Sequence, residues 1–559
     1  MESSIILPPA LALIGAGVLV PMTRGAVRAA VLLLAPLVCL GMVWLVPVGA
    51  QVAVPFLDME LLVVSGTRLG RMFATVFAVM AFLGGLFALN QTRGLELAAA
   101  LIYAGAAVGV TFAGDLVTLF IFWEVMAVGS TLVIWSNGEA ARRAGMRYGV
   151  MHLLGGVILM AGIAGQAGSS GSVAFGPMDV QTWPGALILI GFLINAAALP
   201  MAAWLPDAYP KASWSGMVFL SAFTTKTAVY VLMVGFAGTN ALIWIGLGMV
   251  FYGIIYAILE NDMRRILAYS IVNQVGFMVT GIGIGTEMAL NGVAAHAFTH
   301  IIYKALLVMA AGSVLLMTGK SKCSDLGGLF RTMPITTICG IVGALSISAF
   351  PLTSGFVSKS LVTQGAAEMH LPLVWYALTA ASAGVFLHAG IKFPWFVFFQ
   401  KDSGLRPADP PVNMQLAMWI AAGLCMGIGV APGLFYQLLP YATDYAPYTA
   451  SHVIGQLQLL LFSGLAFFLM LGWLKRTLTI TLDFDWLWRK PGVAVLLWSG
   501  GTGARFWAEL ERHWARLLEW RAPNLAPARG WSTGVMAFWT TVMLACFLLI
   551  GAFQAGLAQ

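Results

Sequence analysis

Long apolar runs separated by short polar stretches recur along most of the chain. An α-helix needs about 20 consecutive, mostly apolar residues to cross the hydrocarbon core of a bilayer. Reading the runs between polar residues predicts about sixteen such spans. The predicted spans are residues 5–21, 26–48, 70–90, 95–113, 115–135, 144–166, 184–206, 214–236, 241–259, 265–285, 289–317, 334–365, 373–399, 415–436, 455–475 and 531–553.

The seventh and twelfth spans are predicted to be interrupted. The seventh contains Pro200 and ends at Pro206, and the twelfth carries Pro351 and Gly355 in Phe-Pro-Leu-Thr-Ser-Gly-Phe. Proline removes a backbone donor and clashes with the preceding helical turn. A broken helix is tolerated at membrane depth where protein buries it or where it lines a wet cavity. We therefore favour functional breaks over ordinary kinks.

The composition supports a membrane protein and argues against a soluble domain. Of the 559 residues, 60% are hydrophobic and 9% are charged, whereas a soluble domain carries roughly 25% charged residues. The 63 glycines and 24 prolines agree with this, because both are more frequent in membrane helices than in soluble ones. We predict an all-α polytopic membrane protein with about 14–16 transmembrane helices.

The basic residues predict the orientation of the chain. When the N-terminus is placed outside, Arg68 and Arg71 are the two of 29 lysines and arginines that fall on the outer side, and most others fall in inner loops. This distribution follows the enrichment of Lys and Arg in cytoplasmic loops. The four exceptions lie within spans, and they are Lys226, Lys304, Lys359 and Lys392.

Lysines inside a membrane are costly, about 2.5–3.5 kcal/mol each at the helix centre on insertion scales, and they mark ion or proton pathways. A lysine suits such a pathway because burial lets it release a proton readily. Snorkelling to the interface is the alternative for Lys392, which lies close to the inner boundary. It fits Lys226 and Lys304 poorly, because both are placed about halfway along their predicted helices.

Further ionisable groups stand on the eleventh and fifth spans. His296, His300 and Lys304 recur every four residues, which places them on one helix face. They cover about 12 Å of depth at 1.5 Å per residue, as a proton relay requires. Glu124, about nine residues into the fifth span, needs a cation or a proton; it is a functional candidate, with a structural ion pair as the alternative.

Other chemistries lack their usual signals in this sequence. No Walker loop, GxSxG elbow or HExxH occurs, so ATP hydrolysis and metal-dependent proteolysis lose support. The five cysteines are scattered without a CxxC, which argues against iron–sulfur, zinc and disulfide frameworks. We expect no cofactor and no metal site, and an ion-transporter subunit rather than an enzyme. The cysteines are Cys39, Cys323, Cys339, Cys425 and Cys546.

Several motifs together resemble one family. They are Phe-Trp-Glu-Val-Met-Ala (122–127), Trp-Leu-Pro-Asp-Ala-Tyr-Pro (204–210), Thr-Lys-Thr-Ala-Val-Tyr (225–230), Asp-Met-Arg-Arg-Ile-Leu-Ala-Tyr-Ser (262–270), His-Ala-Phe-Thr-His-Ile-Ile-Tyr-Lys-Ala-Leu-Leu (296–307) and Ser-Gly-Phe-Val-Ser-Lys (354–359). In this order, over about residues 70–475, they resemble the antiporter-like subunits of respiratory complex I and of Mrp-type multisubunit cation/proton antiporters, with relatives in membrane-bound hydrogenases. Residues 376–399 and the LQLLLF segment after His452 look most like the D-type branch of the Mrp antiporter subunits.

The resemblance implies two inverted five-helix repeats, each with one broken helix. It implies that Glu124 is an acidic gate, that Lys226 and Lys304 lie on a central axis beside His296 and His300, and that Lys359 lies near the exit; Lys392 joins this set as the fourth buried lysine. It also implies partner membrane subunits and a prokaryotic cytoplasmic (inner) membrane. The implied domains are 1–94 (N-terminal helices), 95–236 (first repeat), 237–400 (second repeat), 401–476 (C-terminal helices), 477–530 (amphipathic segment on the cytoplasmic side) and 531–559 (final helix).

The sequence departs from the family pattern in the first repeat. The family expects lysine in the seventh span as the partner of the buried glutamate, but this chain has Asn195 in Gly-Phe-Leu-Ile-Asn-Ala. Asparagine can hydrogen-bond Glu124 but cannot supply a charge or a titrating proton. Ala202 likewise stands where many relatives carry histidine. These departures put the first half-channel in doubt, whereas the second half looks intact.

The segment 477–530 interrupts the apolar pattern. Apolar and aromatic residues recur there at three- and four-residue steps, which predicts an amphipathic helix on the inner interface. It either clasps a neighbouring subunit or simply anchors the chain to the membrane surface. The residues of this stripe are Phe506, Leu510, Trp514, Leu517 and Leu518.

Three functions remain open from the sequence. The first is a subunit of a Mrp-type antiporter that exchanges protons for sodium or another monovalent cation. The second is a proton-pumping membrane subunit of a complex I-like or hydrogenase-like redox complex. The third is a structural module whose channel has lost net transport, which Asn195 favours.

Overall fold

The computed structural model describes residues 6–56, 59–472 and 483–486, with short stretches and single residues between 488 and 512. The chain divides into two compact units, Met1–Asp485 and Trp486–Gln559. The described part of the second unit includes a short π-helical stretch, η9 (Trp488–Gly492). The predicted amphipathic stripe over 506–518 and the final span 531–553 lie outside the described residues.

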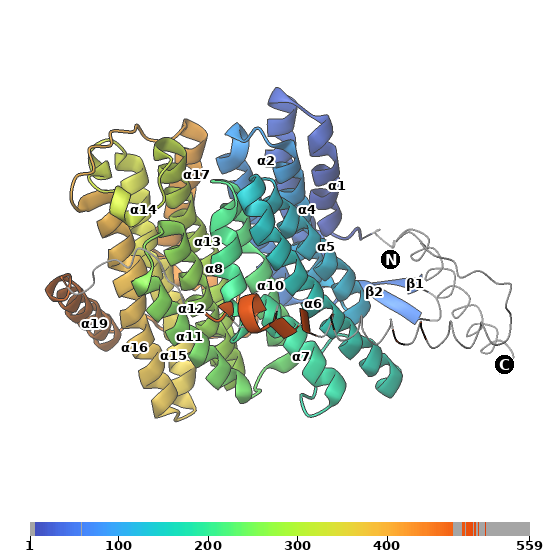
Figure 1. Ribbon diagram of the computed structural model, residues 1–559. Coiled ribbons are helices and arrows are strands. Elements are labelled where there is room, and N and C mark those ends of the chain that lie inside the picture. The colour runs from blue at the N-terminus through green and yellow to red at the C-terminus, as the bar shows by residue number, and fades with distance from the viewer. Residues whose placement is uncertain are drawn as a thin grey trace, which may run out of the picture. The chain divides into compact units, whose positions relative to one another are not determined.

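The first unit is built from α-helices, most of them long and apolar (Figure 1). Among the described residues, 12 helices are long and apolar enough to cross a membrane, and three shorter apolar helices accompany them. This confirms the predicted all-α polytopic fold. The N-terminal elements are α1 (Ala10–Leu19), η1 (Val20–Met22), α2 (Gly25–Leu45), β1 (Gln51–Phe56), β2 (Met59–Ser65), α3 (Arg68–Phe87) and η2 (Ala88–Asn90).

Two series of helices follow, and the third helix of each is the longest of its series. The first series is α4 (Gly94–Phe112), α5 (Leu116–Trp135), α6 (Glu139–Ser170), α7 (Trp183–Asn195), η3 (Met201–Ala203), α8 (Trp204–Ala208), η4 (Tyr209–Lys211), α9 (Gly216–Ala222) and α10 (Thr224–Phe236). The second is α11 (Ala241–Leu259), α12 (Met263–Ile284), α13 (Glu287–Thr318), η5 (Cys323–Asp325), η6 (Leu329–Arg331), α14 (Pro334–Ile347), α15 (Ser354–Glu368), α16 (Pro372–Val385), η7 (Phe386–Lys392) and η8 (Trp395–Phe399). The last helices are α17 (Val412–Val430), α18 (Pro432–Tyr436) and α19 (Ala450–Leu469).

Both predicted breaks are present, at corresponding places in the two series. The third helices, α6 and α13, are 32 residues long each. The next helix of each series stops early: α7 ends at Asn195 and α14 ends at Ile347. Two residues later the backbone turns left-handed, at Ala197 (φ 59°) and Ala349 (φ 56°). Each break leaves the last carbonyls of a helix without intrahelical donors inside the protein.

A third break was not predicted, and it lies next to Lys226. The span 214–236 divides at Phe223, so Lys226 is the third residue of α10 rather than halfway along an uninterrupted helix. Two side chains enter the helical hydrogen-bond ladder there. Tyr103 Oη accepts from Thr224 N at 2.8 Å, and Lys226 Nζ donates to Ser221 O at 2.7 Å. Inserted side chains are an established cause of such kinks, and no proline or glycine marks this one in the sequence.

The span 373–399 also differs from the regular helix that was predicted. After α16, the residues Phe386–Lys392 and Trp395–Phe399 are π-helical. A π-helical turn widens the helix and is often found at functional sites. His388 and Lys392 both lie in the first of these stretches.

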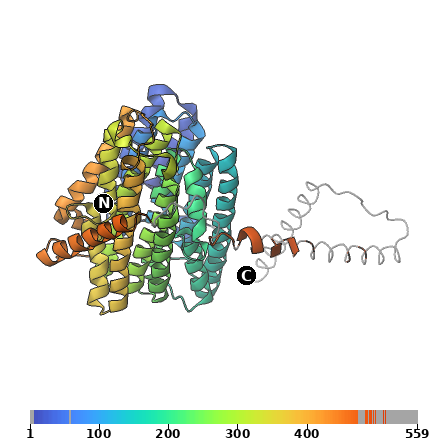
Figure 2. The ribbon, with the colours of Figure 1, turned by 60° about the vertical axis from the view of Figure 1, so that its left-hand side comes forward.

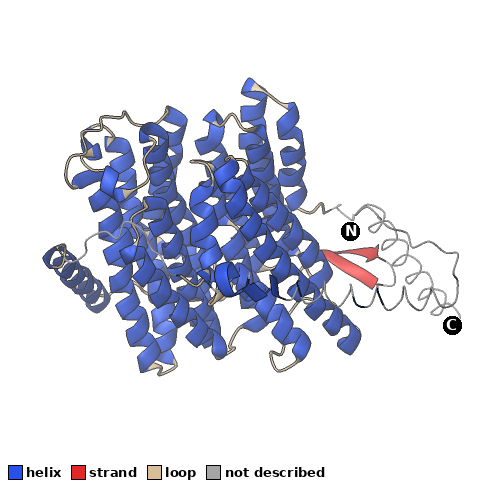
Figure 3. Ribbon diagram, viewed as in Figure 1, coloured by secondary structure: helices blue, strands red, loops and turns tan. Residues whose placement is uncertain are grey.

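One two-stranded sheet among the described residues was missed from sequence. β1 and β2 pair antiparallel between the second and third predicted spans, with an irregularity between Val52 and Ala53 (Figure 3). Leu62 O of β2 accepts a hydrogen bond from Gly114 N at 2.9 Å, which joins the hairpin to the loop between α4 and α5.

The loops that were predicted to lie inside are hydrogen-bonded to one another. Asn137 Nδ2 donates to Lys211 O at 2.8 Å, Arg264 NH1 donates to Ala212 O at 2.9 Å, and Ser321 Oγ donates to Asp262 Oδ2 at 2.5 Å. One end of the bundle therefore gathers the basic loops, as the charge pattern predicted. Which face of the membrane this end meets stays a prediction.

Helix α19, after α17, is much less buried than the helices of the core. α19 lies at an angle to the bundle helices, as Figures 1 and 2 show, and most of its surface is exposed. Farther on, Asp483 reaches α11 and α12, where it accepts hydrogen bonds from Tyr252 Oη (2.7 Å) and Tyr269 Oη (2.5 Å). Asp483, which belongs to the segment predicted to be interfacial, thus contacts the second series.

Candidate functional site

Buried ionisable side chains run through the interior of the second series. α13 is uninterrupted over His296, His300 and Lys304, so the three lie above one another on one face, and each is fully buried. Such a stripe is not explained by packing alone, because burying polar groups is unfavourable unless they are hydrogen-bonded.

His296 is held by side chains of α12, α13 and α15. Its Nε2 lies 3.1 Å from Gln274 Oε1, and its Nδ1 lies 3.4 Å from Ser358 Oγ. Tyr303 Oη donates to the same Gln274 oxygen at 3.2 Å. Ser358 in turn accepts from Thr299 Oγ1 at 2.9 Å. Sequence reasoning missed these uncharged partners because none stands out in its own span.

Lys304 and His300 continue the stripe. Lys304 Nζ donates to Ser270 Oγ at 2.8 Å. Neither ring nitrogen of His300 has a hydrogen-bond partner among the described residues. The ring of His300 lies 6.0 Å from the ring of His296, and Lys304 is one helical turn farther along α13.

Lys226 and Lys359 each bind a carbonyl exposed by a helix break. Lys226 Nζ donates to Ser221 O at 2.7 Å, beside the break at Phe223. Lys359 Nζ donates to Ile347 O at 2.7 Å, at the C-terminal end of α14. Carbonyls at a helix C-terminus carry partial negative charge. Each break can therefore bind an ammonium group without a carboxylate partner.

Lys392 occupies a third helix end. Its Nζ donates to three carbonyls at the C-terminal end of α11: Ala257 O at 3.1 Å and the carbonyls of Ile258 and Glu260 at 2.5 Å each. The side chain is buried. Its amine binds the end of α11 that adjoins the predicted inner loop, so the snorkelling alternative stays open. Lys392 itself lies in the π-helical stretch η7.

His388 was missed from sequence and belongs to the same group. It is fully buried on η7, and its Nδ1 lies 2.8 Å from Gly384 O. The charges of Lys304, Lys392 and Lys359 all reach it. The four-residue spacing between His388 and Lys392 was the available signal.

Glu124 and Asn195 do not pair as expected. Asn195 Oδ1 lies 2.8 Å from His152 Nδ1 of α6, and Glu124 Oε1 has no hydrogen-bond partner among the described residues. The predicted hydrogen bond between Asn195 and Glu124 is therefore not formed: among the described residues, Asn195 Nδ2 has no partner either. Glu124 Oε1 instead faces α6 at Gly156, where an added Cβ would come within 3 Å of it.

Substitution of Gly156 tests the contact with Glu124, and Gly149 on the same helix is the matched control. Gly156→Ala should displace the flexible Glu124 carboxylate with little loss of stability, and lower transport by up to about a hundredfold, as a misplacement of about 1 Å does in other sites. Gly149→Ala meets only ordinary contacts with Thr131 and should leave transport unchanged. Proton-flux assays on both variants at matched protein levels check this. Equal rates in the two variants would show that the position of Glu124 is unimportant.

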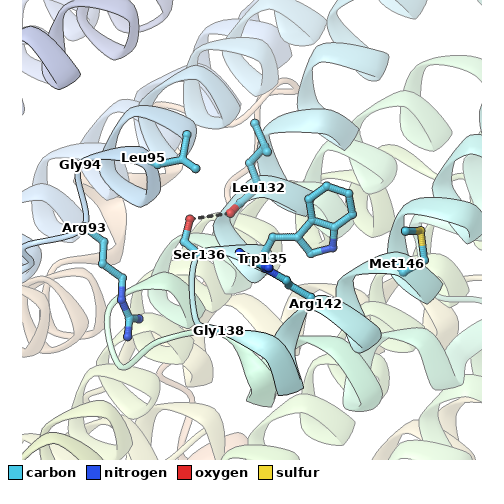
Figure 4. Close-up of a pocket in the computed structure, with 9 residues that line it drawn as sticks. All are labelled: Arg93, Gly94, Leu95, Leu132, Trp135, Ser136, Gly138, Arg142 and Met146. Carbon is cyan, nitrogen blue, oxygen red and sulfur yellow. Dashed lines mark hydrogen bonds between the residues drawn. The ribbon is translucent and has the colours of Figure 1, made fainter.

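A large open pocket lies apart from this buried group. It has a volume of about 680 Å³ and lies where α4, α5 and α6 meet, as Figure 4 shows. Arg93 and Arg142 face it together with Trp135 and apolar side chains, and none of the predicted site residues lines it. Among the described residues, no cluster of three or more His, Cys, Asp or Glu could hold a metal ion.

Sequence comparison places these features in a known family. A family profile described as NADH:quinone oxidoreductase/Mrp antiporter, TM, matches residues 113–384. An uncharacterised protein of Mycobacterium tuberculosis is 30% identical over 426 residues, which cover 68% of this chain and 66% of that protein. The D-type subunit of a Na(+)/H(+) antiporter of Alkalihalophilus pseudofirmus is 30% identical over 321 residues, which cover 52% of this chain and 64% of that protein. The chain thus spans just under two thirds of the length of these relatives.

Solved structures share the fold. A chain of the Mrp complex from Dietzia sp. DQ12-45-1b has a TM-score of 0.68 and 22% identity, covering 78% of this chain and 96% of that chain. A chain of the membrane-bound sulfane sulfur reductase, an archaeal respiratory membrane complex, has a TM-score of 0.73 and 22% identity, covering 97% and 99%. The ordered motifs and the profile match place residues 113–384 in the antiporter-like membrane subunit family of NADH:quinone oxidoreductases and Mrp antiporters.

Proposed function

We propose that this protein is the proton- and cation-translocating membrane subunit of a multisubunit monovalent cation (Na+)/H+ antiporter. The observation that carries the proposal is the group of fully or almost fully buried lysines and histidines on α10, α13, α15 and η7. Its members are Lys226, His300, Lys304, His296, Lys359, His388 and Lys392.

This arrangement suits proton movement by coupled charges. Like charges repel strongly in a low-dielectric interior, so a proton that arrives at one lysine favours the departure of a proton from the next. The hydroxyl groups of Ser270 and Ser358 bind Lys304 and His296, and the carbonyls at the helix breaks bind Lys226 and Lys359, in each case without a carboxylate that would neutralise the charge permanently. Glu124 supplies the acidic group of the first series.

The names of relatives support the antiporter function. A 30% identical relative is the D-type subunit of a Na(+)/H(+) antiporter, and a Mrp complex shares the fold. We propose that the chain works with other membrane subunits in the prokaryotic cytoplasmic membrane and conducts protons and monovalent cations. On this proposal it is an ion-transporter subunit and not itself an enzyme.

A transport assay on the whole complex tests the proposal. Inverted membrane vesicles that contain the complex are acidified inside, and NaCl, KCl or choline chloride is then added while internal pH is followed. We expect Na+ or K+, but not choline, to release the pH gradient. Vesicles carrying Lys304→Met serve as the inactive reference. A gradient that ignores every cation would remove the antiporter proposal.

A second candidate is a proton-pumping membrane subunit of a complex I-like or hydrogenase-like redox assembly. One observation favours it: the chain of the sulfane sulfur reductase matches 97% of this chain, whereas the Mrp chain matches 78%. The subunits that copurify with the protein separate the two candidates. Small antiporter subunits favour the first, and redox subunits with cofactors favour the second.

A further inference from the structure

The first series contains a buried histidine with one free ring nitrogen. His152 of α6 is 1% exposed, and its ring packs between Tyr148 and Trp204 at centroid distances of 4.1 and 4.7 Å. Its Nδ1 lies 2.8 Å from Asn195 Oδ1. Among the described residues, its Nε2 has no hydrogen-bond partner. One nitrogen is thus fixed and the other is left available.

Asn195 is placed to choose the tautomer of this histidine. It is the last residue of α7, immediately before the helix break, and it is buried. When Asn195 Oδ1 accepts the hydrogen bond, the His152 ring keeps its proton on Nδ1 and presents a lone pair at Nε2. Trp204 Nε1 donates to Ile194 O at 3.0 Å. This bond holds Trp204, which packs on the His152 ring, against the same end of α7.

The position of His152 on α6 lies between two groups of the proposed pathway. Gly156, His152 and Tyr148 follow at four-residue steps, so they share one face and are about 6 Å apart along the axis. Gly156 faces Glu124 Oε1. Glu124 therefore lies one helical turn beyond the histidine on one side.

On the other side, hydroxyl groups lead to α10. Tyr148 Oη donates to Ser130 Oγ at 2.9 Å and lies 3.4 Å from Thr224 Oγ1. Thr224 is the first residue of α10, two residues before Lys226. The face of α6 thus runs from the carboxyl group of Glu124, past His152, to the hydroxyls that adjoin the helix of Lys226.

We propose that His152 carries protons between Glu124 and Lys226, and that Asn195 is the residue that positions it. The proton leaves the Glu124 carboxylic acid, which becomes a carboxylate, and binds His152 Nε2, which becomes an imidazolium. Because Nδ1–H is held by Asn195, the proton departs again from Nε2 and converts the neutral amine of Lys226 to an ammonium. This step rests on the proposed function and gives the first series a titrating group despite the asparagine at position 195.

Few other titratable groups stand near this path in the described part of the chain. The titratable groups along this path come from α4, α5, α6, η4 and α10, and the Arg147–Asp207 ion pair of 2.7 Å lies beside Tyr148 in the sequence. Tyrosines dominate this set, and they supply hydroxyls rather than charges. The groups are Tyr103, Glu124, Tyr148, Tyr209 and Lys226.

The test compares variants of the whole complex in proton-flux assays across a range of pH. His152→Gln keeps a polar side chain of similar reach but cannot carry a proton, and it should lower the initial rate at least about tenfold. In the double variant with Asn195→Lys, an amine occupies the same place, and most of the lost rate should return. Asn195→Ala should change the shape of the pH profile more than the maximal rate. Without Asn195 Oδ1, the proton of neutral His152 can reside on either ring nitrogen. His370→Gln, an exposed histidine, is the control.

Each outcome decides something. A His152→Gln complex that assembles and transports at the wild-type rate with an unchanged pH profile overturns the inference. A uniform loss that Asn195→Lys does not relieve means that His152 is structural, which also overturns it. If wild type itself moves no protons, the proposed function has failed instead. Should His152→Gln reduce assembly, Asn195→Ala and its pH profile carry the test alone.

Discussion

Replacing Lys304 by methionine is expected to abolish transport while leaving the complex assembled. Methionine fills nearly the same volume but carries no proton, and among the described residues Lys304 Nζ makes one short hydrogen bond, to Ser270 Oγ. Removing the central charge interrupts the coupling among Lys226, His300 and Lys359. We expect the rate to fall at least about a hundredfold, the scale of losing an essential proton carrier.

Two further variants separate loss of charge from loss of fold. Lys320→Met, in the exposed turn after α13, is the matched control and should transport normally. Ser270→Ala removes only the partner hydroxyl and should cause a smaller loss. The amount of each variant that copurifies with its neighbouring subunits reports assembly. Near-normal flux with Lys304→Met would assign this lysine a structural role.

The second large effect is expected on stability, at Arg264. Its buried guanidinium donates to three carbonyls of the loop after α8: Pro210 O (3.0 Å), Ala212 O (2.9 Å) and Ser213 O (2.7 Å). The loop is also tied to α4, because Ser213 and Ser215 donate to buried Glu96 at 2.5 and 2.6 Å. Arg264→Ala leaves these carbonyls without donors, which should cost about 3 kcal/mol or more.

Arg142 is a control with the opposite setting. Its side chain is 67% exposed and lies 3.7 Å from Glu139, which is 73% exposed, and an exposed pair of this kind contributes roughly 0–1 kcal/mol. Thermal unfolding of the purified complex should therefore show a clear drop for Arg264→Ala and almost none for Arg142→Ala. Equal midpoints would mean that the loop after α8 is held by other contacts.

Local sequence signals predicted the elements of the fold well. The apolar runs predicted the spans. In lipid, the backbone groups must be hydrogen-bonded within the helix, and a helix needs about 20 residues to cross the bilayer. Proline gave the breaks in α7–α8 and α14–α15, since it cannot continue the ladder. The four-residue spacing gave the stripe of His296, His300 and Lys304, because a helix repeats every 3.6 residues.

The sequence could not predict features that arise between distant segments. The break beside Lys226 depends on Tyr103 of another helix, which takes the amide hydrogen of Thr224. The hairpin of β1 and β2 likewise depends on pairing and on the contact with Gly114. Neither leaves a local pattern in its own residues.

By itself, the sequence determined that this chain is a polytopic helical membrane protein with buried lysines and histidines in antiporter-like motifs. The tertiary structure alone decided what those groups meet: His152 and Asn195 bond across 43 residues, and Lys392 reaches the α11 carbonyls across 135. The reason is physical. Helix formation depends on neighbours within a few residues, whereas the partner of a buried polar group is set by which helix ends pack together and leave carbonyls and ring nitrogens unpaired.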